Sequence, residues 1–186
     1  MMHWHDKYLF RPIERRDLEL VLKWRNSDRI RENMYTSHVI SFDEHLKWFE
    51  KISTENKTLH FIFEVDNIPL GVVNITNIDN DNKKCVWGFY IGAENAPQGC
   101  GSAMGFFALE HLFEKLGFHR VVGEAFAFNA DSVKYHKRLG FIEEGVFYDY
   151  VIKDEKYEDI VTLAILEDRW REIKPSLIKK FFERDG

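Results

Sequence analysis

A glycine-rich stretch of six residues has the residue types of an anion-binding loop. It comprises Gln98, Gly99, Cys100, Gly101, Ser102 and Ala103. Glycine permits backbone conformations that a Cβ disfavours. The apolar run from Met104 to Leu116 predicts a helix with one weak position at Gly105. The free N–H groups at a helix N-terminus attract phosphate. The stretch therefore predicts either a phosphate-binding loop or a tight strand-to-helix connection without a ligand.

Glu124 and Tyr135, farther along the chain, are ionisable residues in apolar surroundings. Glu124 is the only carboxylate between Val121 and Phe128. A charge in such a run is expensive to bury, so it should be solvated, paired or functional. Tyr135 lies one helical turn before Leu139 and shares a helix face with it. The plainer alternatives are a solvent-facing glutamate on an alternating strand and a buried tyrosine with a satisfied hydroxyl.

Tyr135 belongs to a second motif, which follows the first by about one strand and one helix. This motif comprises Asn129, Ser132, Tyr135 and the run Leu139-Gly140-Phe141. Together with residues 98–103, it resembles the paired coenzyme-A signatures of the GCN5-related N-acetyltransferases. The resemblance implies that acetyl-CoA is the co-substrate and that a primary amine attacks its thioester.

The same resemblance implies how acetyl-CoA is held. The N–H groups from Gly99 to Ala103 would surround the pyrophosphate. The strand around Phe89, Tyr90 and Ile91 resembles the family's splayed strand, whose backbone takes the pantetheine arm as an added strand would. Asn129 has two candidate roles, a hydrogen bond to that arm and capping of the following helix.

Two catalytic roles also follow from the resemblance. Tyr135 takes the position of the general acid that protonates the leaving sulfur. Glu124 is then the candidate general base for the attacking amine, acting directly or through water.

The order of the predicted elements matches the acetyltransferase fold over nearly the whole chain. The predicted strands cover residues 8–12, 60–65, 70–78, 85–91, 120–128, 141–151 and 157–166. The predicted helices cover residues 18–26, 29–34, 104–116, 131–139 and 168–182, and one further helix begins after Ser41. Asp17 is the predicted N-cap of the first helix, and Ser41 opens a capping box. Pro175 is expected to bend or split the last helix. We expect a mixed α/β fold whose central sheet is mostly antiparallel and flanked by helices.

We expect one domain over residues 1–186, with residues 1–80 mainly on the acceptor side. Residues 85–166 would form the cofactor core, and residues 167–186 the C-terminal helix.

Composition and charge argue against several classes of protein. The chain has 186 residues, a formal net charge of -5 and two cysteines, Cys85 and Cys100. A disulfide framework and a nucleic-acid polymer as partner are therefore not expected. No apolar run reaches the roughly 18 residues of a membrane span, and no signal-peptide pattern is present. With only two cysteines, a reducing cytoplasm is the expected location. His3 and His5 lack further ligands at suitable spacing, so no metal is expected.

The N-terminal half should bind the acceptor, because the C-terminal half holds the cofactor. Its runs from Leu22 to Met34 and from Ser41 to Phe49 resemble the subgroup that acetylates the 4-amino group of a UDP-linked amino-dideoxy sugar, in the pseudaminic acid pathway used for flagellin glycosylation. The phosphates, flat base and sugar of such a ligand are best bound by planar cations, aromatic rings and small polar groups. The residues predicted to bind it are Arg25, His45, Thr76, Asn77 and Lys134, with Trp24 or Trp48 nearby.

Plainer interpretations remain for these residues. Arg25 is also consistent with a solvated helix charge, and the two tryptophans with core packing. One predicted helix face is basic and comprises Lys134, His136, Lys137 and Arg138. This face either contacts ligand phosphates or is simply solvated. The rival functions are a protein N-terminal or ribosomal-protein acetyltransferase and a non-catalytic acetyl-CoA-binding protein. A strand near the C-terminus could also pair across a homodimer.

Overall fold

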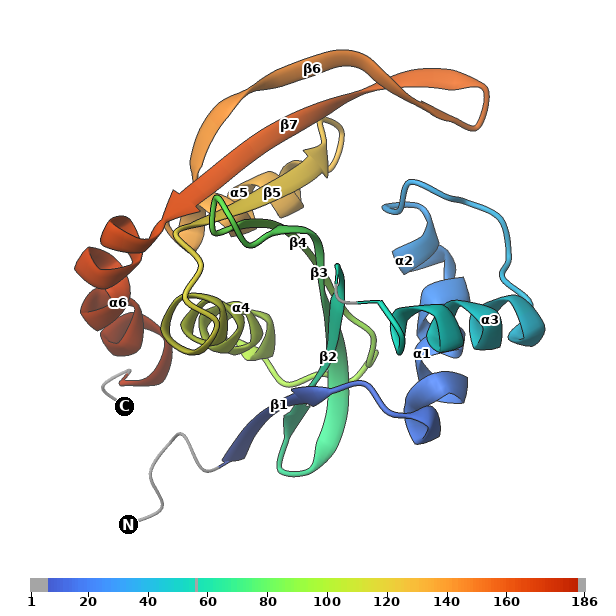
Figure 1. The fold of residues 1–186 in the computed structure, drawn as a ribbon, viewed down its shortest axis with the longest axis horizontal. Coiled ribbons are helices and arrows are strands. Elements are labelled where there is room, and N and C mark those ends of the chain that lie inside the picture. The colour runs from blue at the N-terminus through green and yellow to red at the C-terminus, as the bar shows by residue number, and fades with distance from the viewer. Residues whose placement is uncertain (1–6, 56, 184–186) are drawn as a thin grey trace.

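The computed structural model describes residues 7–55 and 57–183. Seven strands form one sheet in the order β1-β2-β3-β4-β5-β7-β6 (Figure 1). The pair β4 and β5 is parallel, and the other neighbouring pairs are antiparallel. The strands are β1 (Tyr8–Pro12), β2 (Leu59–Val65), β3 (Ile68–Asp79), β4 (Lys84–Ile91), β5 (Arg120–Phe126), β6 (Ile142–Lys153) and β7 (Lys156–Leu166). The expected mixed α/β fold with a mostly antiparallel sheet is confirmed.

Helices cover both faces of this sheet. The α-helices are α1 (Leu18–Asn26), α2 (Asp28–Arg31), α3 (Phe42–Ile52), α4 (Cys100–Glu110), α5 (Ala130–Arg138) and α6 (Glu167–Phe182). A 3-10 turn, η2 (Arg15–Asp17), precedes α1, and a π-helical turn, η3 (His111–Lys115), follows α4. Figure 1 shows α4 and α6 on one side of the central strands and α1, α2 and α3 on the other.

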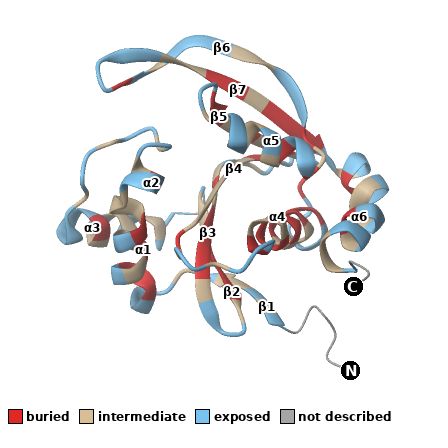
Figure 2. Ribbon diagram, turned by 180° about the vertical axis from the view of Figure 1, so that it is seen from behind, coloured by how far each residue is buried: buried red, intermediate tan, exposed pale blue. Residues whose placement is uncertain are grey.

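Strand β2 shows why both faces are covered. Phe61 and Phe63 pack into the core that contains α4, whereas Ile62 between them packs against Val21 and Trp24 of α1. Successive side chains of a strand point to opposite faces, so a continuous apolar run requires a layer on each side. Figure 2 shows buried residues along β3 and β7 and on α4.

Several predicted elements agree with the structure. The strand at residues 8–12 and the helix at residues 18–26 have the predicted bounds. Asp66 and Asn67 have φ angles of 51° and 63°, as a tight hairpin turn requires. Ser41 caps α3 by accepting the Glu44 N–H at 3.2 Å, whereas the Glu44 carboxylate contacts His38.

Other bounds differ from the predictions. The second helix is only Asp28–Arg31, and the helix predicted from Met104 begins at Cys100 and becomes π-helical at His111. Pro175 does not split α6. Pro175 is exposed, so water can satisfy the carbonyl that loses its N–H partner.

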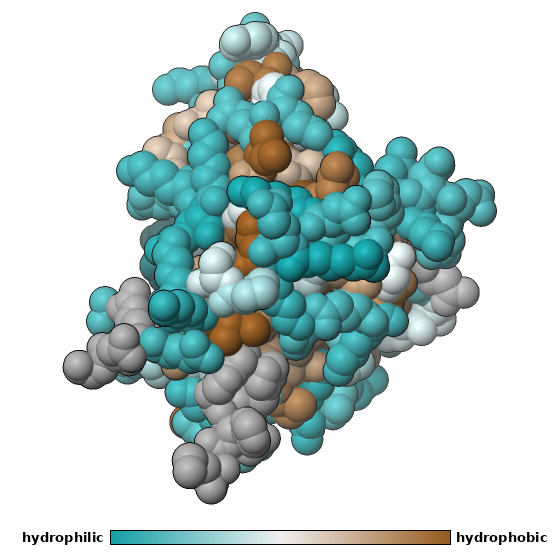
Figure 3. Space-filling model, turned by 90° about the vertical axis from the view of Figure 1, so that its left-hand side faces the viewer, coloured by the Kyte–Doolittle hydropathy of each residue, from teal (hydrophilic) through white to brown (hydrophobic). Residues whose placement is uncertain are grey.

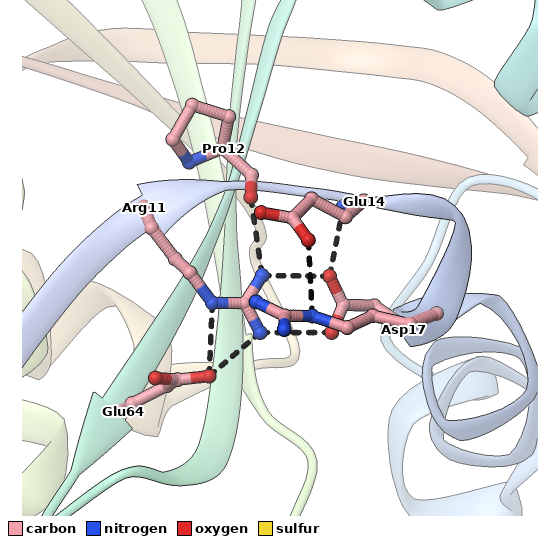
Figure 4. A network of polar contacts seen from close by, with 6 residues as sticks. Arg11, Pro12, Glu14, Asp17 and Glu64 are labelled. Carbon is pink, nitrogen blue, oxygen red and sulfur yellow. Dashed lines mark hydrogen bonds and ion pairs between the residues drawn. The ribbon is translucent and has the colours of Figure 1, made fainter.

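Arg11 joins β1 to β2 and to η2 (Figure 4). Its guanidinium donates to both carboxylate oxygens of Asp17, at 2.7 and 2.9 Å, and to Glu64 Oε1 at 2.6 and 2.9 Å. Burial opposes ionisation of Asp17, but the hydrogen bonds from Arg11 and the Glu14 N–H lower the pKa of Asp17 overall. Asp17 is the N-cap residue of α1, as predicted, but its side chain does not accept a hydrogen bond from the helix backbone. The carboxylate is instead engaged by Arg11 and by the Glu14 N–H.

Strands β4 and β5 separate halfway along their length. Their parallel pairing runs from Lys84 opposite Arg120 to Trp87 opposite Gly123. Beyond that point β4 continues to Ile91 alongside β3, while β5 continues alongside β7. The β4 segment 88–91 therefore has an edge that is not paired with β5, and the opening between the strands positions the candidate site.

The β6–β7 hairpin reaches over the segment between α2 and α3 (Figure 1). Lys153 Nζ donates to the Met34 carbonyl at 2.9 Å, and Ser37 Oγ donates to Asp154 Oδ1 at 2.7 Å. These contacts connect the end of the sheet to the N-terminal helices. Met34 and Tyr35 of this connecting segment line the candidate site together with residues of β4 and β5.

The side of the molecule that carries α6 has a mostly hydrophilic surface with scattered apolar patches (Figure 3). Among the described residues, no helix combines the length and the apolar character that crossing a bilayer would need.

Candidate active site

A cavity of about 860 Å³ opens where β4 and β5 separate. The predicted cofactor residues that line it are Phe89, Tyr90, Ile91, Gln98, Gly99, Gly101, Ser102, Asn129, Ser132 and Tyr135. Glu124 lines the same cavity from β5. Residues from four separate parts of the sequence thus meet at one opening.

The glycine-rich loop leads into α4 with unpaired N–H groups. Gly99 has a φ of 87°, which lies in the left-handed region that favours glycine. The Cys100 N–H donates to the Pro97 carbonyl at 3.1 Å and the Ala103 N–H to the Gly99 carbonyl at 3.1 Å. Within the described residues, the N–H groups of Gly101 and Ser102 donate to no backbone carbonyl. This arrangement fits an anion such as a pyrophosphate.

Cys100 and Ala103 contribute to this loop through their backbones. Both side chains are buried in the core beneath α4. Burial raises the pKa of the Cys100 thiol, which therefore stays protonated at neutral pH. The thiol is not an activated nucleophile.

Tyr135 projects from α5 toward the start of α4. Its ring packs on Phe89 with 4.6 Å between the centroids, and its hydroxyl donates to the Gly101 carbonyl at 2.6 Å. Burial raises the pKa of the Tyr135 phenol, so the hydroxyl stays protonated at neutral pH. The phenol proton lies in the cavity wall, between the glycine-rich loop and the free segment of β4.

Glu124 has a partner that the sequence did not indicate. The Tyr35 hydroxyl, from the segment between α2 and α3, donates to Glu124 Oε2 at 2.6 Å. Burial raises the pKa of Tyr35, and the neighbouring Glu124 carboxylate raises it further. Tyr35 therefore remains a donor at neutral pH. Among the described residues, Glu124 forms no ion pair.

Both polar ends of the Asn129 side chain are engaged. Oδ1 accepts the Ser132 N–H at 3.0 Å, which caps α5. Nδ2 donates to Asn33 Oδ1 at 2.8 Å. The capping role is therefore observed, and the role of Asn129 toward a pantetheine arm stays a prediction.

The residues predicted for the acceptor divide into two groups. Thr76 and Asn77 line the cavity from β3, whereas Arg25, His45 and Lys134 do not line it. The structure thus brings only part of the predicted acceptor set to the opening.

The three residues outside the cavity have other partners. Arg25 Nη2 donates to the backbone and side-chain oxygens of Thr36 at 2.9 and 2.7 Å. His45 is buried, with its ring stacked 4.9 Å from that of Trp48. Lys134 is exposed and lies 3.9 Å from Asp131 on its own helix. Helix packing turns Arg25 and His45 away from the cavity, and Lys134 faces solvent.

His136 corrects the expected basic face of α5. It is 1% exposed and lies against Trp87. Trp87 Nε1 donates to His136 Nε2 at 3.1 Å, so the ring proton is on Nδ1, which donates to the Ser132 carbonyl at 2.8 Å. Burial lowers the pKa of His136 to about 4. The face therefore lacks one of its four expected cations, while Arg138 lines the cavity.

The cavity also contains residues that the sequence analysis missed. They are Arg29, Asn33, Tyr35 and Asn74. Arg29 donates to the carbonyls of Ile91 and Gly92, each at 3.0 Å. The sequence offered only a weak signal for them, because each is an isolated polar residue: in the short helix α2, in the irregular segment after it or, for Asn74, within the strand β3.

No group of three or more metal-ligating side chains gathers anywhere in residues 7–55 and 57–183. His3, Trp4 and His5 lie outside the described residues.

Comparison with known proteins agrees with this geometry. Residues 7–142 match the family model described as Acetyltransferase (GNAT) domain. Acetyltransferase PseH of Campylobacter jejuni is 27% identical over 147 residues, which cover 77% of this chain and 90% of that protein. Spermidine N(1)-acetyltransferase of Vibrio cholerae is 23% identical over 161 residues, which cover 86% of this chain and 93% of that protein.

A solved structure has the same fold. The spermidine N-acetyltransferase from Vibrio cholerae, in complex with CoA and spermine, superposes with a TM-score of 0.83 at 22% identity. The match covers 89% of this chain and 98% of that one. The family match, which spans most of the chain, decides the assignment: this protein belongs to the GNAT family and is an N-acetyltransferase.

Proposed function

We propose that this enzyme transfers the acetyl group of acetyl-CoA to the 4-amino group of UDP-4-amino-4,6-dideoxy-N-acetyl-β-L-altrosamine, in the pathway that makes pseudaminic acid for flagellin glycosylation. The observation that carries the proposal is the polarity of the acceptor side of the cavity. Its lining is rich in neutral hydrogen-bonding side chains, namely Asn33, Tyr35, Asn74, Thr76 and Asn77. Such groups suit the hydroxyl, amide and base edges of a nucleotide sugar.

The sequence relationships support the same acceptor. The N-terminal motifs resemble the subgroup that acts on this sugar nucleotide, and the relative named acetyltransferase PseH covers most of the chain. Arg29 adds a planar cation to the lining, which is the group that phosphate recognition favours.

The proposed reaction follows from the positions of two residues. The neutral amine attacks the thioester carbonyl carbon, the C–S bond breaks, and the thiolate leaves. Glu124 takes the proton that the amine loses, directly or through water, because its carboxylate faces the cavity. Tyr135 supplies the proton or hydrogen bond that the sulfur needs, after its hydroxyl leaves the Gly101 carbonyl.

Acetyl-CoA would lie along the C-terminal half of the cavity. The free N–H groups of Gly101 and Ser102 would hold its pyrophosphate. Arg138, which lines the same side, would add a positive charge near its phosphates. The edge of residues 88–91 that is not paired with β5 would accept the pantetheine arm as a strand does, with the Ile91 carbonyl already bound by Arg29.

A polyamine is the second candidate acceptor, because the spermidine acetyltransferases share the fold and one of them is 23% identical. A polycation requires several carboxylates. The charged side chains lining this cavity are two arginines and two acids: Arg29, Arg138, Glu124 and Asp131. That balanced set favours an acceptor that is not a polycation.

Acetyl transfer can be measured as release of the CoA thiol with three acceptors: the UDP-4-amino sugar, spermidine and a peptide with a free N-terminus. We expect turnover with the sugar nucleotide, and we expect UDP alone to compete with the sugar but not with acetyl-CoA. Turnover with spermidine or the peptide only would refute the proposed acceptor. Binding of CoA without turnover of any amine would instead favour a non-catalytic protein.

A further inference from the structure

Residues 32–40, between α2 and α3, form an irregular segment that we call the acceptor loop. Helix α1 holds one part of it, because Arg25 Nη2 donates to the Thr36 carbonyl at 2.9 Å and to Thr36 Oγ1 at 2.7 Å. Asn26 closes the end of the loop through two bonds with the backbone of Ile40, at 2.8 and 2.9 Å. The loop has no regular secondary structure of its own, yet its backbone groups are tied to fixed helical side chains.

Two more cations hold the middle of the acceptor loop. Arg31 Nη1 donates to the Ser37 carbonyl at 2.7 Å. Lys153, from the β6–β7 hairpin, donates to the Met34 carbonyl at 2.9 Å and is only 8% exposed. A buried ammonium is expensive unless it is well hydrogen-bonded. The position of the loop is therefore specified from both sides.

These contacts bring one side chain into the catalytic opening. Tyr35 lies between the two clamped residues Met34 and Thr36, and its hydroxyl donates to Glu124 Oε2 at 2.6 Å. Its ring packs edge-on against Phe126 with 5.5 Å between the centroids. One hydrogen bond thus joins the middle of the acceptor loop to a carboxylate 89 residues away in the sequence.

We propose that Tyr35 is a positioning residue, which holds the Glu124 carboxylate so that its other oxygen faces the attacking amine or the intervening water. This inference rests on the proposed role of Glu124 as general base. A glutamate without a partner would sample several rotamers, and misplacement of a reacting group lowers the rate steeply. A hydroxyl donor bound to one carboxylate oxygen fixes the orientation and leaves the other oxygen free.

The Tyr35→Phe variant removes the hydroxyl and keeps the ring against Phe126. We expect kcat to fall about tenfold to hundredfold, the range given by loss of a hydrogen bond to a charged group, while KM for acetyl-CoA stays unchanged. The matched control is Tyr148→Phe, at a side chain that is 78% exposed, and it should keep the wild-type kcat. An unchanged kcat in Tyr35→Phe, or an equal rise in KM for acetyl-CoA, would overturn the proposal.

A double-mutant cycle distinguishes positioning of Glu124 from an independent effect. In a Glu124→Gln background, we expect Tyr35→Phe to cause little further loss of kcat. Additive losses would show that Tyr35 acts by another route. The assay uses whichever amine the enzyme acetylates, so an error in the proposed sugar acceptor would not mask the result.

Discussion

At the scale of single residues, Tyr135 and Glu124 face one cavity from different elements, and each is held by one hydrogen bond. Tyr135 donates to the Gly101 carbonyl, and Glu124 accepts from Tyr35. At reference pKa values near 10 and 8.5, full proton transfer from a phenol to a thiolate is uphill by about 2 kcal/mol. Burial raises the pKa of Tyr135 further and makes full transfer more uphill. The role that fits this phenol is therefore a hydrogen bond to the leaving sulfur, from a hydroxyl that stays protonated.

Removal of either group should therefore lower turnover rather than cofactor binding. We expect Tyr135→Phe and Glu124→Gln each to reduce kcat about 100-fold to 10,000-fold, the usual contribution of a general acid or base. Calorimetric titration should give nearly wild-type affinity for acetyl-CoA, since the Gly101 and Ser102 N–H groups are untouched. Wild-type kcat in one of these variants would remove that residue from the mechanism.

At the scale of elements, the contact between α4 and α5 depends on a glycine of α4, Gly105. A Cβ on Gly105 would lie 2.4 Å from Tyr135 Oη and 2.5 Å from Leu139 Cδ1. The glycine that weakens α4 as a helix therefore allows α5 to approach closely. This close approach sets the position of the phenol.

The Gly105→Ala variant should displace the Tyr135 hydroxyl and lower kcat. The free energy of unfolding should fall by about 1–3 kcal/mol from overpacking, less the roughly 1 kcal/mol that alanine contributes to helix propensity. Urea unfolding and steady-state kinetics would measure both effects. Gly145→Ala is the control, because a Cβ there meets open space. Equal kcat in the two variants would contradict this account of the helix contact.

At the scale of the whole molecule, the protonation of His136 in the core should make the free energy of unfolding depend on pH. Its folded pKa of about 4 lies below the ordinary value of 6.5 because the ring is buried, so protonation favours the unfolded state. The stabilisation is complete above about pH 6.5 and is lost as the pH falls toward 4. The expected loss is on the order of 3 kcal/mol.

Urea unfolding across this pH range would test the linkage. We expect the free energy of unfolding of the wild type to fall more steeply toward pH 4 than that of His136→Gln, which has no titrating ring. Because the carboxylates titrate in both proteins, the difference between the two curves isolates His136. Parallel curves would show that this histidine does not set the acid stability.

The sequence-based prediction was most accurate where structure depends on neighbours in the chain. The hairpin at Asp66-Asn67 and the Asn129 cap are local backbone features, and both are observed. Pairing of a C-terminal strand across a homodimer stays one of the possibilities that the sequence leaves open. The division of the chain into acceptor and cofactor parts, the cytoplasmic location and the absence of nucleic-acid and membrane partners stay predictions.

By itself, the sequence determined the fold, the family and most of the residues that line the C-terminal part of the cavity, because two compact motifs place a glycine turn and a capped helix through short-range backbone preferences. Only the tertiary structure decided which N-terminal side chains line the cavity. Arg25 and His45 were plausible ligands by residue type, but packing between α1 and α3 and the acceptor loop turns them away from the cavity. The Tyr35–Glu124 bond joins residues 89 positions apart, and no local pattern encodes a contact made by the docking of a loop against a sheet.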